Sequence, residues 1–352
     1  MLPTTTKQWV ITDGETTTPK LHFDIEAKIP EVGDYDVLVQ FHFAALNNRD
    51  VSISKGVYGR PVSSRFIPGC DASGAVVAVG PRVIRFKTGD RVASLFSPAW
   101  IGGPLTPGLS LTTIGGNVDG VMTQYGVFNE NGLSMIPDSL SWEEGATLTC
   151  AGVTAWNALF GLKRVMPGDF VLTQGTGGVS LFAVQFALAA GAIVVATTSS
   201  PEKAEVLKNL GAHHVLNYNS DPEWGVAARK LTPDAIGFEH VIDVVGPKTM
   251  SQSLKAVAIG GVLSVIGGVG GGFGDASIQQ PLMVEALFNF CTVRGVAVGS
   301  RVQFEEMTRA IEANGIKPVF DKKVFRLDEY EKALQYLAQG EHVGKVLIQI
   351  SN

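Results

Sequence analysis

Short runs of β-branched and aromatic residues alternate with Gly, Pro, Asn and Asp through the first 135 residues. The clearest runs are YDVLVQFHFAAL, DASGAVVAVG, DRVASLF and VMTQYGVF. Turn residues recur about every 10 residues, which predicts a small antiparallel barrel or sandwich. Residues 97–120 lack this alternation, and loops of that length are usually functional.

The pattern changes after residue 140. The segment SWEEGATLTCAGVTAWNALF has helical spacing, with Ser141 as N-cap and Glu144 completing a capping box. Strands separated by helical segments then follow: FVLTQ, AIVVATT, HHVLNY, FEHVIDVVG, GVLSVIGG and TVRGVAVG. This alternation predicts an α/β fold with a doubly wound, six-stranded parallel sheet.

The C-terminal segment returns to β character in VFDKKVFRL and GKVLIQI, around one helix at 328–339. We expect these elements to rejoin the N-terminal domain. The predicted domains are therefore residues 1–135, completed by about 318–352, and residues 136–317.

Composition excludes several classes of protein. The 28 Lys and Arg against 33 Asp and Glu give a net charge of −5, without a basic block, so nucleic acid is not an expected partner. Cys70, Cys150 and Cys291 lie far apart in the sequence and predict neither a disulfide framework nor a zinc ribbon. A reducing compartment, the cytoplasm, fits best. The first 20 residues do not resemble a targeting peptide.

No charged residue occurs between Asp169 and Glu202, a length that could cross a membrane. Three glycines, at 175, 177 and 178, and polar residues such as Gln174 interrupt this stretch. Its order of strand, glycine turn, helix and strand predicts a buried βαβ unit instead of a membrane span.

The turn Gly175-Thr176-Gly177-Gly178-Val179-Ser180 lies between a strand and a helix. In a dinucleotide-binding fingerprint the first glycine permits a tight turn, and the second lets the backbone approach a pyrophosphate at the helix N-terminus. Ser180 replaces the third glycine here. A purely structural turn is the alternative, but the βαβ context favours a cofactor site.

The following strand indicates which dinucleotide is bound. NAD-preferring sites place Asp or Glu about 20 residues beyond the glycines, whereas this chain has Thr197-Thr198-Ser199-Ser200 and then Lys203. A carboxylate would repel a 2′-phosphate, but hydroxyls and an ammonium can donate to it. This pattern favours NADP(H). Alternatively, Ser199 and Ser200 only cap the next helix and Lys203 is solvated.

Several segments together resemble the medium-chain dehydrogenase/reductase superfamily: AALNNRD, PGCDASGAVVAVG, FKTGDRV, AGVTAWNAL, QGTGGVS and GKVLI. The resemblance covers nearly the whole chain. It implies a GroES-like β-barrel catalytic domain, a Rossmann cofactor domain and an active site in the cleft between them. It also implies homodimers joined through the last Rossmann strand, TVRGVAVG.

The chain departs from the zinc-dependent members of this superfamily. Those enzymes carry a Cys near the position of Ala45, and a Gly-His-Glu where this chain has Gly69-Cys70-Asp71. They also carry four cysteines near residues 95–115, a stretch that contains none here. Zinc needs three or four converging ligands, and the nearby candidates are Cys70, Asp71 and His42. We therefore expect no metal, and a small buried Cys70.

The chain is more similar to the zinc-free quinone oxidoreductase-like branch. This likeness implies places in the catalytic site for Asn47, Asp50, Tyr58 and Thr154. It also implies that the cofactor contacts further residues beyond the glycine turn, Ser199, Ser200 and Lys203, namely Tyr218, Gly268, Val269, Ala297, Val298, Gly299 and Lys345. The alternatives are that Tyr58 only covers a turn, and that Asp50 is a helix cap or an ion-pair partner.

Hydride transfer to an acceptor leaves negative charge on an oxygen, which zinc or hydrogen-bond donors must stabilise. Without zinc the donors are Asn47, Tyr58, Thr154 or water, and neutral donors suit the spread charge of an enolate or hydroquinone. The resemblance and this chemistry predict an NADPH-dependent oxidoreductase acting on a quinone or α,β-unsaturated carbonyl. The alternatives are an NADP-dependent alcohol dehydrogenase or carbonyl reductase, and a non-redox NADPH-binding enzyme or sensor.

Overall fold

The chain folds into two units. The computed structural model describes residues 2–13, 19–271, 277–278, 281 and 283–351. The first unit comprises Met1–Val153 together with Gly299–Asn352, and the second comprises Thr154–Val298. None of the described helices is long and apolar enough to span a membrane.

The crossing points between the units differ from the predicted boundaries at 135/136 and 317/318. Helix α2 (Trp142–Ala146) packs on strands β3 and β5, and helix α9 (Arg301–Asn314) packs against β8. Both helices therefore belong to the first unit, although they flank the second in sequence.

The first unit is built mainly of antiparallel strands. These are β1 (Thr5–Thr12), β2 (Lys20–Lys28), β3 (Asp36–Ala45), β4 (Arg65–Phe66), β5 (Asp71–Val79), β6 (Arg91–Ser94), β7 (Tyr125–Asn129), β8 (Leu133–Met135), β15 (Phe320–Arg326) and β16 (Lys345–Gln349). A seven-stranded sheet has the order β15-β16-β3-β5-β6-β8, with β7 also paired to β3. The C-terminal strands thus rejoin the N-terminal domain, as predicted.

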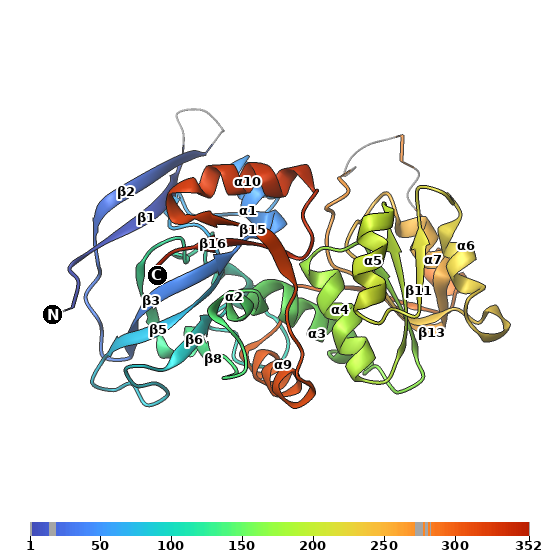
Figure 1. The fold of residues 1–352 in the computed structure, drawn as a ribbon, viewed down its shortest axis with the longest axis horizontal. Helices are drawn as coiled ribbons and strands as arrows, with labels where there is room; N and C mark the ends of the chain where they lie inside the picture. Colours follow the sequence, from blue (N-terminus) through green and yellow to red (C-terminus); the bar gives the residue numbers. More distant parts are fainter. Residues whose placement is uncertain (1, 14–18, 272–276, 279–280, 282, 352) are drawn as a thin grey trace. The chain divides into compact units, whose positions relative to one another are not determined.

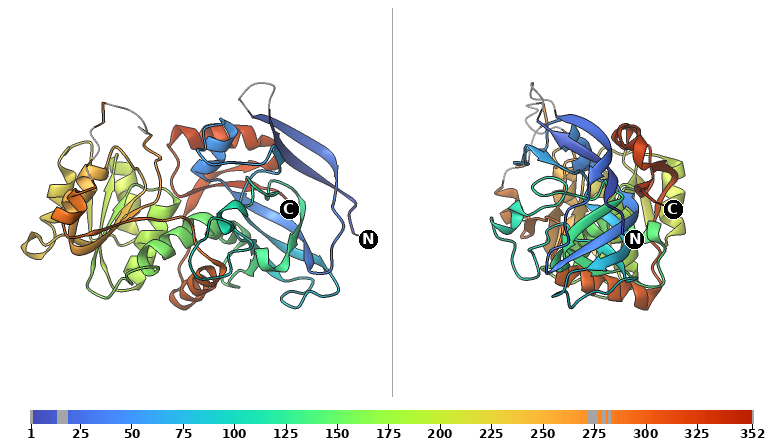
Figure 2. Two further views of the ribbon diagram at one scale, coloured as in Figure 1. Left: turned by 180° about the vertical axis from the view of Figure 1, so that it is seen from behind. Right: turned by 90° about the vertical axis from the view of Figure 1, so that its left-hand side faces the viewer.

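The sequence did not predict the pair β1 and β2, which Figures 1 and 2 show as one antiparallel ribbon. With β4 they form a separate three-stranded sheet. Strand β2, KLHFDIEAK, leaves most of its residues exposed or half-buried. It therefore lacks the apolar run that marks a buried strand.

The second unit contains the predicted doubly wound sheet. Its strands are β9 (Phe170–Gln174), β10 (Ile193–Thr198), β11 (His214–Asn217), β12 (Phe238–Asp243), β13 (Val257–Val265) and β14 (Thr292–Gly295). All are parallel, in the order β11-β10-β9-β12-β13-β14. The charge-free stretch folds as β9, α4 and β10, so the βαβ prediction is confirmed.

Helices cover both faces of this sheet. The helices that contact its strands are α4 (Gly178–Ala189), α5 (Pro201–Asn209), α6 (Trp224–Arg229) and α7 (Met250–Ala256). The helices α3 (Val153–Phe160) and α8 (Glu285–Phe288) lie in the same part of the chain. Figure 1 shows α4 and α5 on one face and α6 and α7 on the other. The remaining helices, α1 (Asn48–Ser54) and α10 (Tyr330–Gln339), pack against each other in the first unit.

The helix predicted to begin at Ser141 is interrupted. Its capping box is confirmed, since Ser141 N donates to Glu144 Oε2 at 2.7 Å and Glu144 N donates to Ser141 Oγ at 3.2 Å. After α2, however, a π-helical turn covers Leu148–Gly152 before α3 begins. Single π turns often occur at functional sites, and this one carries Cys150.

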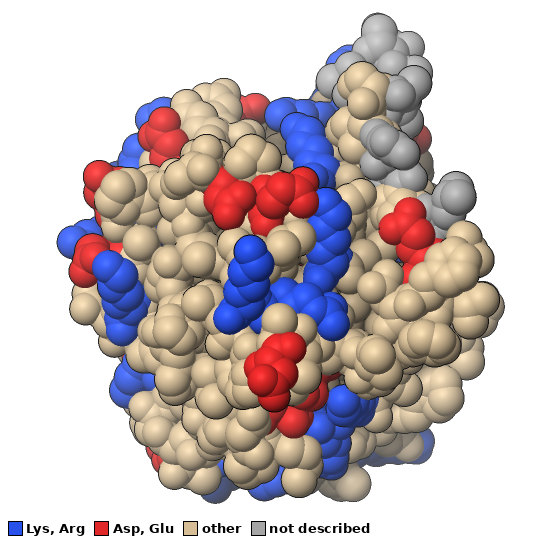
Figure 3. All heavy atoms as spheres, turned by 90° about the vertical axis from the view of Figure 1, so that its right-hand side faces the viewer, with Lys and Arg blue, Asp and Glu red and all other residues tan. Residues whose placement is uncertain are grey.

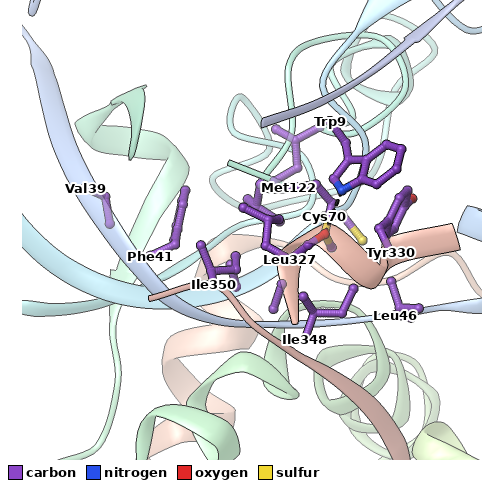
Figure 4. Packing of buried hydrophobic residues seen from close by; sticks show 14 of the residues in the cluster. Trp9, Val39, Phe41, Leu46, Cys70, Met122, Leu327, Tyr330, Ile348 and Ile350 are labelled. Atoms are coloured by element: carbon purple, nitrogen blue, oxygen red, sulfur yellow. Dashed lines mark hydrogen bonds between the residues drawn. The ribbon is translucent and has the colours of Figure 1, made fainter. Parts of the chain in front are cut away.

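The core of the first unit surrounds Cys70, which is fully buried. Figure 4 shows Cys70 among apolar side chains that include Met122 and Leu46. Trp9 donates its indole N–H to the Leu327 carbonyl at 2.7 Å. The prediction of a small buried Cys70 is confirmed.

Candidate functional site

The glycine turn has the geometry of an anion-binding cradle. Gly175, directly after β9, has a φ of +75°, and Gly177 is the N-cap of α4. A Cβ built on either glycine meets no atom within 4 Å, so the space beside them is open. The N-cap residue Gly177 offers no side chain to cap the first turn of α4. The backbone N–H groups there suit a pyrophosphate, and these residues fit a dinucleotide.

Ser180 explains how the turn works without a third glycine. Its hydroxyl donates to the Gln174 carbonyl at 2.6 Å and ties α4 to the end of β9. The Gln174 side-chain amide donates to Ser253 at 2.8 Å and to Asp243 at 3.3 Å. Asp243 also accepts from Gly246 N at 2.8 Å. Asp243 was not predicted, although an acidic residue at the end of a parallel strand is a signal that could have indicated it.

The hydroxyl-rich end of β10 lies beside the end of β11. Thr198 is the register partner of Asn217, and Tyr218 N donates to the Thr198 carbonyl at 3.0 Å. Ser200 caps α5, because its Oγ accepts from Lys203 N at 3.3 Å. The capping role is therefore real for Ser200. The Glu202 carboxylate is hydrogen-bonded to its own backbone N–H and to the same hydroxyl, and these two bonds lower the pKa of Glu202.

Other predicted cofactor residues lie where the chain crosses between units. Thr154 begins the second unit, Ala297 and Val298 end it, and Gly299 follows. Val298 has a φ of +44°, and its carbonyl accepts from Asn157 Nδ2 at 2.6 Å. That bond holds a backbone conformation that valine rarely adopts.

Gly268, Val269 and Gly299, three of the predicted cofactor residues, differ in their surroundings. Gly268 and Val269 follow β13, where Val269 N donates to the Val244 carbonyl at 3.3 Å. Gly299 allows close packing, since a Cβ on it would lie 2.6 Å from Val153 Cγ2.

Lys345, a predicted cofactor contact, is buried inside the first unit. Its Nζ donates to the Leu46 carbonyl at 2.6 Å, to Asn47 Oδ1 at 2.5 Å and to Asp71 Oδ2 at 3.0 Å. These acceptors engage all three N–H groups of the ammonium. Burial lowers the pKa of Lys345, but Asp71 and its neighbours raise it, and the net direction is upward.

Two thiols complete this polar cluster, which we define as Asn47, Cys70, Asp71, Cys150 and Lys345. Cys70 Sγ donates to Asp71 Oδ1 at 3.1 Å and accepts from Asn47 Nδ2 at 3.4 Å. The ligand atoms of Cys70, Asp71 and Cys150 lie within 4.8 Å of one another. Burial, the thiol of Cys150 and the charge of Asp71 raise the pKa of Cys70 well above its usual value.

The polar cluster has only part of what a zinc site requires. Two thiols and a carboxylate are donors that zinc accepts, but a zinc site needs three or four free ligands. Here Asp71 already accepts from Lys345 and Cys70, and a metal would have to displace a buried ammonium. As arranged, the residues do not fit zinc. His42, a predicted candidate ligand, instead stacks on Trp142 with ring centroids 4.5 Å apart.

Two of the predicted catalytic residues, Asn47 and Asp50, lie together at the start of α1, whereas Tyr58 lines a cavity. Asn47 belongs to the polar cluster. Asp50 Oδ2 accepts from Asn47 N at 2.8 Å, so Asp50 completes the start of α1. Burial raises the pKa of Asp50 to about 6, against the opposing effects of Arg49 and the Asn47 N–H.

Tyr58 is placed differently. It is half-buried and lines a cavity of about 450 Å³ together with residues from 60–61 and 105–117. Its hydroxyl accepts from Arg49 Nε at 3.3 Å. Arg49 was not predicted, although it lies between Asn47 and Asp50 in the segment NNRD. The approach of Cys150 to Cys70 was not predicted either, because helical spacing in the sequence does not reveal a π turn.

Comparisons with known proteins agree with this architecture. Residues 33–138 match the model of the alcohol dehydrogenase GroES-like domain, and residues 178–313 match that of the zinc-binding dehydrogenase family. A zinc-type alcohol dehydrogenase-like protein of Schizosaccharomyces pombe is 42% identical over 328 residues, covering 92% of this chain and 94% of that protein.

Two further proteins are similar over nearly their full length. A quinone oxidoreductase of Mus musculus is 25% identical, covering 94% of this chain and 93% of its own. A crystal structure of an alcohol dehydrogenase candidate from Sinorhizobium meliloti 1021 has a TM-score of 0.89 at 37% identity, covering 99% of this chain and 100% of that one.

A GroES-like unit and a parallel six-stranded nucleotide-binding unit define a dehydrogenase/reductase of the two-domain type. The chain belongs to the medium-chain dehydrogenase/reductase superfamily, whose named relatives here are oxidoreductases.

Proposed function

We propose that this chain is a zinc-independent, NADPH-dependent oxidoreductase that transfers a hydride to a quinone or an α,β-unsaturated carbonyl. The observation that carries the proposal is the ion pair of Lys345 and Asp71, 3.0 Å long and buried on both sides. A cation supplied by the protein already neutralises the carboxylate at the place where zinc-dependent members have their Gly-His-Glu. We place the activity in the cytoplasm, because three free thiols suit a reducing compartment.

A metal analysis tests the zinc-independent part. After dialysis, we expect far less than one zinc per chain by mass spectrometry, and no loss of activity in EDTA. One tightly bound zinc per chain, lost together with activity, would instead favour a zinc alcohol dehydrogenase built on Cys70, Asp71 and Cys150.

The cofactor preference is supported by the end of β10. Ser199, Ser200 and Lys203 stand where a carboxylate would select NAD, and Tyr218 follows the neighbouring strand. When bound, the reduced nicotinamide supplies the hydride. The N-terminus of α4 binds the pyrophosphate, and the hydroxyls with Lys203 bind the 2′-phosphate.

The Lys203→Ala variant tests this assignment. We expect the KM for NADPH to rise about 10-fold, because a charge-assisted hydrogen bond is lost, while the KM for NADH hardly changes. Lys208→Ala, on the same helix and paired with the exposed Glu205, is the matched control. Equal changes for both cofactors contradict the 2′-phosphate assignment.

The acceptor class follows from the donors available in the first unit. Asn47 has both ends of its amide engaged, whereas Tyr58 lines an open cavity. A phenol hydroxyl is a neutral donor, which suits the delocalised charge of an enolate or hydroquinone. A panel of quinones, enones, aldehydes and alcohols, followed by NADPH absorbance, tests this. Enone products should keep their C=O group, and reduction of simple aldehydes alone contradicts the proposal.

We also propose a homodimer formed through β14. This strand is an edge of its sheet and pairs only with β13 among the described strands. Large apolar side chains gather beside it and are between 62% and 83% exposed, namely Ile259, Met283, Leu287, Phe288 and Phe290. Phe290 O accepts from Gly260 N at 2.8 Å, which brings Ile259 into the same patch. Exposed patches of this kind mark interfaces.

Sedimentation at micromolar concentration tests the dimer. We expect the wild type to be dimeric and Phe288→Asp to be monomeric. Ile84→Asp, at an exposed apolar position of the first unit, is the control and should remain dimeric. On the face shown in Figure 3, basic and acidic side chains are interspersed. A monomeric wild type contradicts the proposal.

A further inference from the structure

The guanidinium of Arg49 is the least explained feature of the first unit. Arg49 lies on α1, is 9% exposed, and forms no ion pair with a carboxylate in the described part of the chain. Its Nε donates to Tyr58 Oη at 3.3 Å and its Nη1 to the Ile114 carbonyl at 3.0 Å. Its Nη2 is buried without a hydrogen-bond partner among the described residues. A buried cation with an open donor is costly, and the attraction of the neighbouring Asp50 carboxylate offsets only its charge and leaves the open donor unexplained.

Two aromatic rings hold Arg49 in place. Its Cζ lies 5.3 Å from the ring centroid of Tyr58 and 4.8 Å from that of Phe96. Burial lowers the pKa of Arg49, but Cys70, Tyr58 and Asp50 raise it, and the net direction is upward. The side chain is therefore a fixed positive charge beside the Tyr58 hydroxyl.

Tyr58 connects this charge to the 450 Å³ cavity, a size suited to a small organic ligand. The apolar part of the cavity wall comes from Pro61, Leu105, Pro107 and Leu111. Two wall hydroxyls donate within the wall itself, Thr113 to Asn117 and Ser110 to the Pro107 carbonyl, each at 2.7 Å. The wall is therefore mainly apolar, with Arg60 as a cationic side chain beside Tyr58.

The Tyr58 hydroxyl differs from these wall hydroxyls. A phenol oxygen can accept hydrogen bonds but has one hydrogen to donate. Since Arg49 Nε donates to this oxygen, the hydrogen of Tyr58 must point elsewhere. No protein acceptor for it occurs among the residues that the structure describes. It is available to a ligand in the cavity.

We infer that Arg49 is a positioning residue that orients and polarises the Tyr58 hydroxyl toward the oxygen of an apolar acceptor held in this cavity. The inference rests on the proposed function. A hydride that adds to the β-carbon of an enone breaks its C=C π bond. A new C=C bond forms to the carbonyl carbon, and the carbonyl π pair moves onto oxygen as an enolate. Tyr58 donates to that oxygen, Arg49 strengthens the donation, and water then protonates the α-carbon.

Turnover in a double-mutant cycle is the first test. We expect Tyr58→Phe and Arg49→Met each to lower kcat about 10- to 100-fold, with the KM for NADPH unchanged. Because Arg49 acts through Tyr58, the double variant should be no slower than Tyr58→Phe alone. Independent, multiplying losses would overturn the inference, as would a normal kcat in Arg49→Met.

Ligand binding is the second test, and it needs no turnover. 4-Nitrophenolate carries an enolate-like oxyanion, and nitrobenzene is its neutral counterpart. In equilibrium dialysis we expect Arg49→Met to weaken nitrophenolate binding about 10-fold and to leave nitrobenzene within about two-fold. Equal weakening of both probes would show a merely structural role for Arg49. Failure of every acceptor in the NADPH assay refutes the proposed function, but this titration still decides the role of Arg49.

Two variants control for general damage. Arg82 forms a similar but exposed pair with Tyr35, with Nη1 3.5 Å from the hydroxyl and Cζ 5.7 Å from the ring. Arg82→Met should change neither kcat nor nitrophenolate binding. Should Arg49→Met not fold, Gly116→Ala replaces it, because the new methyl would lie 2.9 Å from Arg49 Nη2. We expect it to weaken nitrophenolate selectively, and an unselective loss would count against the inference.

Discussion

The glycine turn of the second unit and the polar cluster of the first differ in whether their hydrogen-bond donors are satisfied by the protein. At the turn, Gly175 and Gly177 leave open space beside helix N–H groups to which the N-cap glycine offers no side chain. In the cluster, the ammonium of Lys345 is fully engaged by buried protein acceptors. Open donors indicate a place prepared for a charged ligand, and donors that the protein itself satisfies indicate a structural role.

Lys345 and Arg49, both in the first unit, differ in the same respect, namely whether their hydrogen-bond donors are satisfied. Both are buried cations, but Lys345 has a carboxylate partner and Arg49 keeps an open donor among the described residues. The difference supports a structural role for the ammonium and a functional role for the guanidinium. The following experiments test these distinctions.

The largest effect on stability is expected from breaking the polar cluster. Lys345→Met leaves the Asp71 carboxylate buried without its partner, so we expect the free energy of unfolding to fall by about 3 to 5 kcal/mol in urea titrations. The exposed pair of Lys208 and Glu205 provides the control, and Lys208→Met should change stability little. A small loss of stability for Lys345→Met would mean that the buried ion pair of Lys345 and Asp71 does not form in solution.

Opposite pH dependences should distinguish the two units. Burial lowers the pKa of His240, on β12, to about 4. Its stabilising contribution is present above the unfolded pKa of 6.5 and is lost as pH falls toward 4. Asp50, whose folded pKa is raised to about 6, contributes below its unfolded pKa of 3.8, and that contribution is lost as pH rises through 6.

Each contribution is about 3 kcal/mol. The free energy of unfolding in urea, measured between pH 4 and 7, should lose part of its pH dependence in each variant. His240→Gln should remove the loss of stability toward low pH, and Asp50→Asn should remove the loss of stability toward high pH. Both variants keeping the wild-type pH dependence would contradict the burial of these groups.

The open turn should be sensitive to a single carboxylate. Gly177 has N-cap geometry, so Gly177→Asp should cap α4 and keep the protein folded. Its charge would compete with a pyrophosphate for the same N–H groups, and we expect affinity for NADPH and NADH to fall about 100-fold in fluorescence titrations. Gly177→Ser, an uncharged cap, is the matched control. Unchanged affinity in Gly177→Asp would place the cofactor elsewhere.

Two helix caps give the smallest and most selective contrast. Ser200→Ala in the second unit and Ser141→Ala in the first should each cost about 1 kcal/mol of stability. Only Ser200→Ala should also raise the KM for NADPH, by about three-fold, since only Ser200 lies at the end of β10. Equal KM values in the two variants would make Ser200 a cap and nothing more.

The sequence predicted features that depend on local spacing. The strands of the parallel sheet, the glycine turn and the Ser141 capping box all follow from patterns within a few residues. Contacts between distant segments could not be predicted in this way. Lys345 meets Asp71, and Cys150 meets Cys70, only because the C-terminal strand β16 and the π turn return to β3 and β5.

The interleaving of the two units along the chain also has a consequence for biosynthesis. Thr154–Val298 is continuous, so it leaves the ribosome complete and can fold while translation continues. The first unit needs β16, close to the C-terminus, to pair with β3. Its N-terminal part must therefore wait, with an unpaired strand edge, until the last residues are made. A ribosome stalled at Gly340, after the second unit has left the exit tunnel and before β16 is made, should display a protease-resistant second unit together with a first unit that is still cleaved.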